Sequence, residues 1–265
     1  MSIKGKVALV TGAARGIGRA TAHVLADEGA DIGVVDILPE VVSVIGEIEA
    51  KGRRSAAAIV DISDSAQVRD GVQSIVESLG TIDILVNNAG IVNNIAPLTK
   101  MTHEAWQREI SVNLSGTFNM IKAVINPMLE QKWGRIINVS SIGGPGGLHY
   151  QSAYAASKAG IHGLTKTVTL EHANDGITCN VIVPGIINTE LVHQMPQEIQ
   201  TGALAMIPSR RFGRTEEVGY LVAFLASDQA AFVNGAEISI DGGMRLNTSI
   251  LGSRKELKEL NEEVL

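Results

Sequence analysis

Short apolar runs recur along the chain, and longer stretches with helical periodicity separate them. The runs do not alternate polar and apolar residues, which is typical of strands that are buried on both faces. Between the first two runs, apolar and small residues recur at helical spacing from Ile17 to Leu25, which predicts an amphipathic helix. The predicted strands are Val7–Val10, Ile32–Val35, Ala56–Val60, Ile82–Val86, Arg135–Val139, Thr178–Val183 and Glu237–Ile240.

The alternation of strand and helix continues to about residue 243. Parallel strands joined by helices require right-handed crossovers, which place helices on both faces of one sheet. We therefore predict an α/β fold over residues 1–245: a single-domain, doubly wound (Rossmann) parallel sheet of about seven strands.

The last residues depart from this pattern and are predicted to form a separate extension, 246–265. Ser253 followed by Glu256 is typical of a capping box, and Leu257, Leu260 and Val264 form a narrow apolar stripe. Because a helix this short is marginal alone, two interpretations stay open. One is a helix that docks on its own domain or on a neighbouring subunit, and the other is a solvated tail.

Net charge, apolar run length and cysteine content bear on the expected partners, location and disulfide bonds of the protein. The formal charge is −6 without a basic run, so nucleic acid and anionic membranes are not expected as partners. No apolar run approaches the roughly 18 residues of a membrane span, and the start of the chain does not have the pattern of a secretory signal. Cys179 is the only cysteine, so no intrachain disulfide can form. We expect a cytoplasmic protein.

A glycine-rich turn follows the first predicted strand and opens the first predicted helix. Backbone N–H groups at a helix N-terminus bind phosphate, and glycines let a ligand approach them closely. We predict that this turn holds a dinucleotide through Gly12, Arg15, Gly16, Ile17 and Gly18.

Asp36 ends the second predicted strand. A carboxylate there accepts hydrogen bonds from the adenine ribose diol, whereas a 2′-phosphate would meet like charge. Asp36 therefore favours NAD(H) over NADP(H). Arg15 could bind a 2′-phosphate, so NADP(H) stays open as the alternative cofactor.

The spacing G-x-x-x-G-x-G in this turn resembles the short-chain dehydrogenase/reductase family. Further matches follow in the family's order over about residues 5–243. They are Asp61-Ile62, Asn87-Asn88-Ala89-Gly90, Asn113, Ser140-Ser141, Tyr154-x-x-x-Lys158, and Pro184-Gly185 with Thr189.

The resemblance implies a set of cofactor contacts. Asp61 and Ile62 would contact adenine. Tyr154 and Lys158 would also contact the cofactor, Lys158 through the nicotinamide ribose. The remaining contacts would come from Asn88, Ala89, Gly90, Pro184, Gly185, Ile187 and Thr189, of which Ile187 and Thr189 would hold the nicotinamide carboxamide.

Tyr154 and Lys158 are four residues apart in a helical stretch, so both project from one helix face. An ammonium about 4 Å from a phenol contributes roughly 4 kcal/mol toward the phenolate, which lowers a phenol pKa of about 10 by up to about 3 units. We expect Tyr154 to act as general acid/base. Ser141 is expected to hydrogen-bond the substrate oxygen.

The resemblance adds two assignments. Asn113 would hold a water that relays protons to Lys158, although a bond to neighbouring backbone is the alternative. Ser141 is preferred to Ser140 because of the family's spacing to the tyrosine.

Other chemistries have little support. Six histidines occur without an H-E-x-x-H pattern, so no metal site is predicted. The residues around Ser141 lack the G-x-S-x-G pattern of a hydrolase.

The segment 188–208 is predicted to be a flap that closes over the substrate. Leu191, Met195, Leu204 and Met206 would give it an apolar lining, unless they pack the flap onto the domain. The substrate is therefore expected to be partly apolar.

The segment Ile207–Arg214 and the motif set are similar to those of 3-oxoacyl-acyl-carrier-protein reductases. Asp36 departs from their usual NADPH site. Asp175 stands before Gly176, where they carry a basic residue that grips the acidic carrier. Lys132 and Arg135 are the only basic candidates nearby.

The main interpretation is an NAD-dependent oxidoreductase that interconverts a secondary alcohol and a ketone, small or thioester-linked. The alternatives are an NADPH-dependent 3-oxoacyl-acyl-carrier-protein reductase and a catalytically silent dinucleotide-binding subunit. The resemblance also implies a homotetramer, with close helix contacts at Ala155, Ala159 and Gly163.

Overall fold

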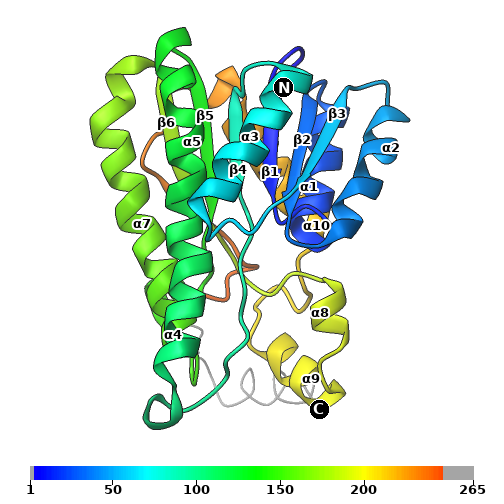
Figure 1. The fold of residues 1–265 in the computed structure, drawn as a ribbon. Helices are drawn as coiled ribbons and strands as arrows, with labels where there is room; N and C mark the ends of the chain where they lie inside the picture. The colour runs from blue at the N-terminus through cyan, green and yellow to red at the C-terminus, as the bar shows by residue number, and fades with distance from the viewer. Residues whose placement is uncertain (1–2, 247–265) are drawn as a thin grey trace.

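The computed structural model of the chain describes residues 3–246. These residues form a seven-stranded parallel sheet in the order β3-β2-β1-β4-β5-β6-β7, which confirms the predicted fold (Figure 1). The strands are β1 (Val7–Thr11), β2 (Asp31–Asp36), β3 (Ser55–Ile59), β4 (Ile84–Asn87), β5 (Gly134–Val139), β6 (Ile177–Pro184) and β7 (Glu237–Ile240).

Helices cover both faces of the sheet. On one face α1, α2 and α10 pack against the strands, and on the other α3, α5 and α7 do so. The helices are α1 (Gly16–Asp27), α2 (Ser43–Glu49), α3 (Ser65–Leu79), α4 (His103–Ile110), α5 (Gly116–Gln131), α6 (Gly143–Gly146), α7 (Ser152–His172), α8 (Glu190–His193), α9 (Gln197–Ala205) and α10 (Thr215–Ala226).

The central strands are buried along their whole length because helices cover them on both sides. Every residue of β1, β4, β5 and β6 is buried, whereas β7 at the edge of the sheet is partly exposed. The non-alternating apolar pattern therefore has the predicted cause.

The flap segment contains α8 and α9. Most of the extension 246–265 lies outside the described residues. None of the helices within residues 3–246 is long and apolar enough to span a bilayer.

The order of the strands reverses between β1 and β4, because the chain builds the sheet outward from β1 in two directions. In open parallel sheets, ligands bind at such a reversal, outside the carboxyl ends of the strands. This places Gly12, after β1, beside Asn88, after β4.

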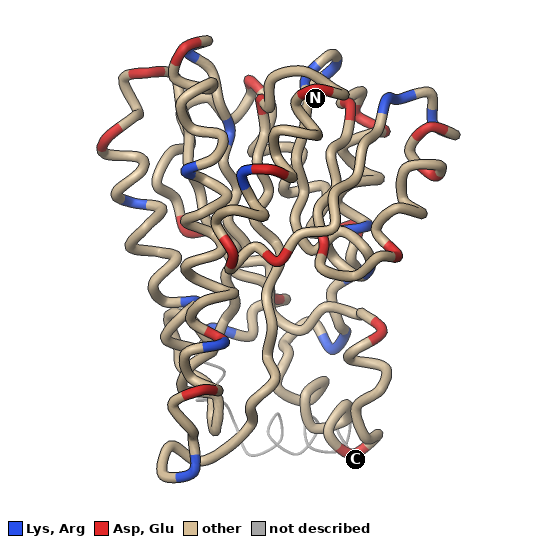
Figure 2. Tube along the Cα trace, in the orientation of Figure 1, with Lys and Arg blue, Asp and Glu red and all other residues tan. Residues whose placement is uncertain are grey.

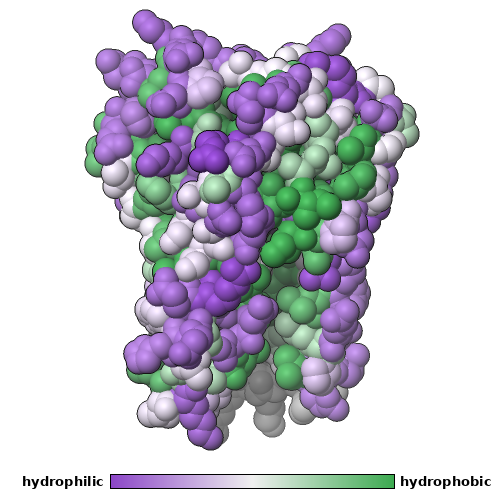
Figure 3. All heavy atoms as spheres, in the orientation of Figure 1, coloured by the Kyte–Doolittle hydropathy of each residue, from purple (hydrophilic) through white to green (hydrophobic). Residues whose placement is uncertain are grey.

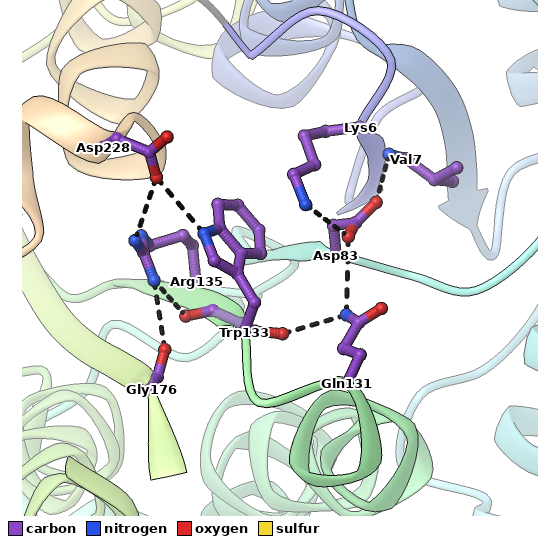
Figure 4. A network of polar contacts seen from close by, with 9 residues as sticks. Lys6, Val7, Asp83, Gln131, Trp133, Arg135, Gly176 and Asp228 are labelled. Carbon is purple, nitrogen blue, oxygen red and sulfur yellow. Dashed lines mark hydrogen bonds and ion pairs between the residues drawn. The ribbon is translucent and has the colours of Figure 1, made fainter. Parts of the chain in front are cut away.

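The amino ends of the strands carry a polar network at the opposite edge of the sheet (Figure 4). Asp83 accepts hydrogen bonds from the Lys6 ammonium at 3.0 Å and from the Val7 N–H at 2.9 Å. The Trp133 ring lies between two cations, with Lys6 Nζ 3.7 Å and the Arg135 guanidinium carbon 4.3 Å from its centre.

Arg135 does not provide the free basic surface that the sequence suggested. It is 4% exposed, stacks on Trp133 and pairs with Asp228. Of the two basic candidates near Gly176, only Lys132 is exposed.

Candidate active site

The glycine turn is shaped by close contact between β1, α1 and the segment after β4. Gly12 and Gly16 have φ of +65° and +56°, the left-handed region that favours glycine. A Cβ at Gly18 would lie 2.1 Å from the Gly12 carbonyl oxygen. No side chain caps the start of α1 at Arg15. The first N–H groups of α1 are thus suited to a phosphate.

Side chains from β1 and from the segment after β4 hold this turn in place. The Thr11 hydroxyl accepts the N–H groups of Asn88 at 3.1 Å and Ala89 at 3.0 Å. The Asn88 amide donates to the carbonyls of Thr11 and Gly12 at 3.0 and 3.1 Å. Asn88 therefore supports the turn as well as lining the site.

Asp36 lies at the carboxyl end of β2, beside the glycine turn. Its carboxylate accepts hydrogen bonds from the N–H groups of Ala14 at 2.9 Å and Leu38 at 3.1 Å. Each carboxylate oxygen can accept a second hydrogen bond, so the side chain remains able to bind a ribose diol.

A cavity of about 340 Å³ runs over these residues. Figure 3 shows apolar surface gathered in the hollow above α8. The predicted cofactor residues that line the cavity are Gly12, Arg15, Gly16, Ile17, Asp36, Asp61, Ile62, Asn88, Ala89, Gly90 and Thr189. The glycine cradle, the uncapped helix and the acidic strand end fit a nicotinamide dinucleotide.

Other predicted cofactor residues do not line this cavity. Gly18 lies against the Gly12 carbonyl instead. Gly185 packs against Asp241, and Ile187 is a buried core residue that contacts Gly213. The Pro184 carbonyl accepts the N–H of Ile142 at 3.0 Å.

Arg108 lines the cavity and was not predicted. It reaches from α4 to the segment after β3, where it donates to the Ser63 hydroxyl at 3.0 Å and pairs with Asp61 at 3.1 Å. Burial would raise the pKa of Asp61, but the hydrogen bonds from Ser63, together with the ion pair to Arg108, outweigh it and lower that pKa. No sequence signal marks Arg108, because the contact joins segments more than forty residues apart.

Tyr154 and Ser141 are brought together at the carboxyl end of β5. The Ser141 hydroxyl lies near enough to the Tyr154 phenol to influence its pKa, and it accepts the N–H of Gly143 at 3.2 Å. Burial raises the pKa of Tyr154; the Ser141 hydroxyl opposes this, and the negative charge of Glu109 adds to it.

The direction of this shift is opposite to our expectation. Lys158 lies one turn from Tyr154, with Nζ 5.8 Å from the ring centre. Lys158 is 4% exposed, and its ammonium donates to the Val139 carbonyl at 2.9 Å. Burial lowers the pKa of Lys158 to about 8. The expectation neglected the cost of burying the phenolate, which is the largest cause of the shift and outweighs the opposing effect of Ser141.

Asn113 lies in a π-helical turn, Ser111–Ser115, between α4 and α5. Its side chain accepts the N–H of Ile91 at 2.8 Å and donates to the Ile91 carbonyl at 2.9 Å and to the Ser157 hydroxyl at 3.1 Å. It therefore joins the segment after β4 to α7. π-Helical turns are frequent at functional sites.

The two neighbouring serines have different surroundings. Ser140 is 4% exposed, donates to the Lys158 carbonyl at 3.0 Å and contacts His162 Nε2 at 2.9 Å. Ser141, in contrast, has its hydroxyl near the Tyr154 phenol. The geometry therefore favours Ser141 as the serine that meets a substrate.

Known proteins resemble the chain over almost its whole length. A family model described as Enoyl-(Acyl carrier protein) reductase matches residues 12–245. The 3-oxoacyl-[acyl-carrier-protein] reductase FabG of Thermotoga maritima is 42% identical over 245 residues, 92% of this chain and 99% of the relative. FabG of Escherichia coli is 40% identical over 92% of this chain and 99% of its own length.

Solved structures share the fold. Levodione reductase superposes with a TM-score of 0.87 at 35% identity, covering 92% of this chain and 99% of that one. A protein described as a gluconate dehydrogenase of Agrobacterium tumefaciens superposes with a TM-score of 0.89 at 31% identity, covering 92% and 98%.

Proposed function

Because the chain belongs to the short-chain dehydrogenase/reductase family and is an oxidoreductase of that family, we propose that it interconverts a ketone and a secondary alcohol with NAD(H). The observation that carries this proposal is the grouping of Tyr154, Ser141 and Lys158, with the Lys158 Nζ 5.8 Å from the Tyr154 ring centre and the Ser141 hydroxyl near the phenol. A catalytically silent dinucleotide-binding subunit would not need these three side chains together.

The roles of the residues follow from their chemistry. Ser141 and Tyr154 donate hydrogen bonds to the carbonyl oxygen, which holds the negative charge that develops there. Tyr154 then gives its proton to that oxygen, and in the reverse direction it accepts the proton. The dinucleotide supplies or accepts the hydride. Lys158 and Asn113 position this group.

The ketone that we propose is a 3-oxoacyl thioester. The 3-oxoacyl reductases among the relatives support this substrate, as do exposed apolar side chains on and beside α8 and α9. Leu191 is 56%, Met195 38% and Met206 57% exposed. These three side chains are therefore not buried where the flap packs onto the domain, and they are available to contact an acyl chain.

The second candidate is an NADPH-dependent reductase of carrier-bound 3-oxoacyl groups, which the names of the relatives favour. Two observations weigh against it. Asp36 lines the cavity with its negative charge, and Arg135 is buried beneath Trp133. Figure 2 shows Lys and Arg interspersed with Asp and Glu along the described trace.

The test is a turnover assay that follows absorbance of the reduced nicotinamide, with NADH and NADPH in turn, and acetoacetyl-coenzyme A against simple ketones. We expect turnover with NADH and the thioester, and none for Tyr154→Phe, which should bind the dinucleotide as tightly as wild type. Preference for NADPH and a carrier-bound substrate would favour the second candidate. Activity retained in Tyr154→Phe would contradict the mechanism.

We also propose that the chain forms a homotetramer. Exposed apolar side chains lie on the outward faces of several elements: Phe118 on α5, Leu170 on α7, Tyr220 on α10 and Phe232 before β7. Ala159 and Gly163 are exposed on α7 and permit close helix contact. Light scattering should give four times the chain mass, and a monomeric mass would refute this.

A further inference from the structure

Glu109 is a buried carboxylate that the proposed chemistry does not use. It lies near the end of α4 and is 1% exposed. One oxygen, Oε1, accepts the N–H groups of Asn93 at 2.9 Å and Asn94 at 3.0 Å. The other, Oε2, is buried and has no hydrogen-bond partner among residues 3–246. Burying a carboxylate in this way is unfavourable, so its presence calls for a physical reason.

Glu109 holds the same segment that Asn113 holds, from four residues earlier in the chain. Asn113 bonds the backbone N–H and carbonyl of Ile91, and Glu109 accepts the N–H groups of Asn93 and Asn94. The segment after β4 is thus fixed at three residues. Gly90 lies in the same segment, and a Cβ there would lie 3.2 Å from both Lys158 Nζ and Asn113 Oδ1. A shift of this segment would therefore disturb the surroundings of Lys158.

Glu109 also acts on Tyr154 through its charge. Helix α4 packs against α7, which carries Tyr154 (Figure 1), and the negative charge of Glu109 raises the pKa of that phenol. Lys158, on α7 itself, has its Nζ 5.8 Å from the centre of the Tyr154 ring. Ser141, from the segment after β5, is uncharged. Burial and the Glu109 carboxylate thus both favour the protonated phenol.

We propose that Glu109 is a positioning residue for the ketone–alcohol reaction. It holds residues 93 and 94, in the segment whose Gly90 lies against Lys158, and its carboxylate, on the helix packed against α7, opposes the formation of negative charge on Tyr154. This inference rests on the proposed function.

Two substitutions separate the two actions. Glu109→Gln keeps a side-chain oxygen that can accept from both N–H groups but removes the charge, whereas Glu109→Leu removes both. Glu104→Gln removes a charge from the exposed face of the same helix and is the matched control.

For Glu109→Gln we expect the alkaline limb of kcat/KM for ketone reduction to move to lower pH by roughly half to one unit. Without the anion, Tyr154 loses its proton more readily, so the proton donor disappears at lower pH. Amide exchange at residues 93 and 94 should stay near wild type. In Glu109→Leu these two amides should exchange about tenfold faster or more. Glu104→Gln should change neither.

An unshifted pH limb in Glu109→Gln would overturn the action on Tyr154, and unchanged exchange in Glu109→Leu would overturn the hold on the segment. Exchange and an ultraviolet titration of tyrosinate need no turnover. If wild type does not turn over, the proposed function fails, whereas these two measurements still decide the effect of Glu109 on the phenol and on residues 93 and 94. The titration of Glu109→Gln decides the charge effect even if Glu109→Leu does not fold.

Discussion

At the scale of single residues, Asp36 is the side chain that we expect to set the cofactor. Replacing it by Ala removes both the ribose acceptor and the charge that repels a 2′-phosphate. The ratio of kcat/KM for NADH over NADPH should fall about tenfold or more. Glu40→Ala, exposed and four residues further on, should leave the ratio within about twofold of wild type. An unchanged ratio in Asp36→Ala would discredit the ribose assignment.

Lys158 links the catalytic group to stability. Its pKa is about 8 in the fold, against 10.5 for an ordinary lysine. Between these values the unfolded chain holds a proton that the fold does not, so stability rises with pH through this window. Below pH 8 the buried ammonium destabilises the fold, by about 3 kcal/mol at most.

Lys158→Met should therefore raise the free energy of unfolding at pH 7 by about 1–3 kcal/mol and abolish turnover. The gain should shrink as the pH rises toward 10. The control is Lys166→Met on the same helix, whose side chain is 57% exposed and which should show no such trend. Urea unfolding at several pH values measures both, and a gain independent of pH would contradict the burial effect.

At the scale of elements, the contact between α1 and β1 depends on Gly18. Alanine there would place its Cβ against the Gly12 carbonyl, so the helix and the strand would have to separate. We expect Gly18→Ala to lower the free energy of unfolding by about 3 kcal/mol and to weaken dinucleotide binding.

The control is Gly46→Ala within α2, where a Cβ meets nothing within 4 Å. It should raise the free energy of unfolding by about 0.5–1 kcal/mol. Equal effects of the two substitutions in urea unfolding would show that close packing at Gly18 does not matter.

At the scale of the whole molecule, the two edges of the sheet have separate tasks. The dinucleotide cavity lies at the carboxyl ends of the strands, and the polar network of Figure 4 joins their amino ends. Asp83→Ala removes the acceptor of Lys6 and Val7 and should lower the free energy of unfolding by about 2 kcal/mol.

Dinucleotide affinity should stay within about twofold in this variant, since the site is at the other edge. The exposed Asp70→Ala on α3 is the control and should change stability by less than about 0.5 kcal/mol. A large loss of affinity in Asp83→Ala, measured by calorimetry, would contradict the separation.

The sequence by itself determined the order of the elements and the motifs that lie within a single turn or helix. Apolar runs and helical periodicity depend on neighbours a few residues apart, so the seven strands and the pair Tyr154–Lys158 could be predicted. The position of Asp36 could be predicted too, because the carboxyl ends of all strands in a parallel sheet meet at the same edge.

Only the tertiary structure decided what depends on packing between distant segments. Arg108 meets Asp61, and Glu109 meets residues 93 and 94, because the tertiary fold brings α4 to the segments that follow β3 and β4. The direction of the Tyr154 pKa shift likewise follows from burial. Burial and contacts between remote residues arise when the layers pack together, and no local pattern records them.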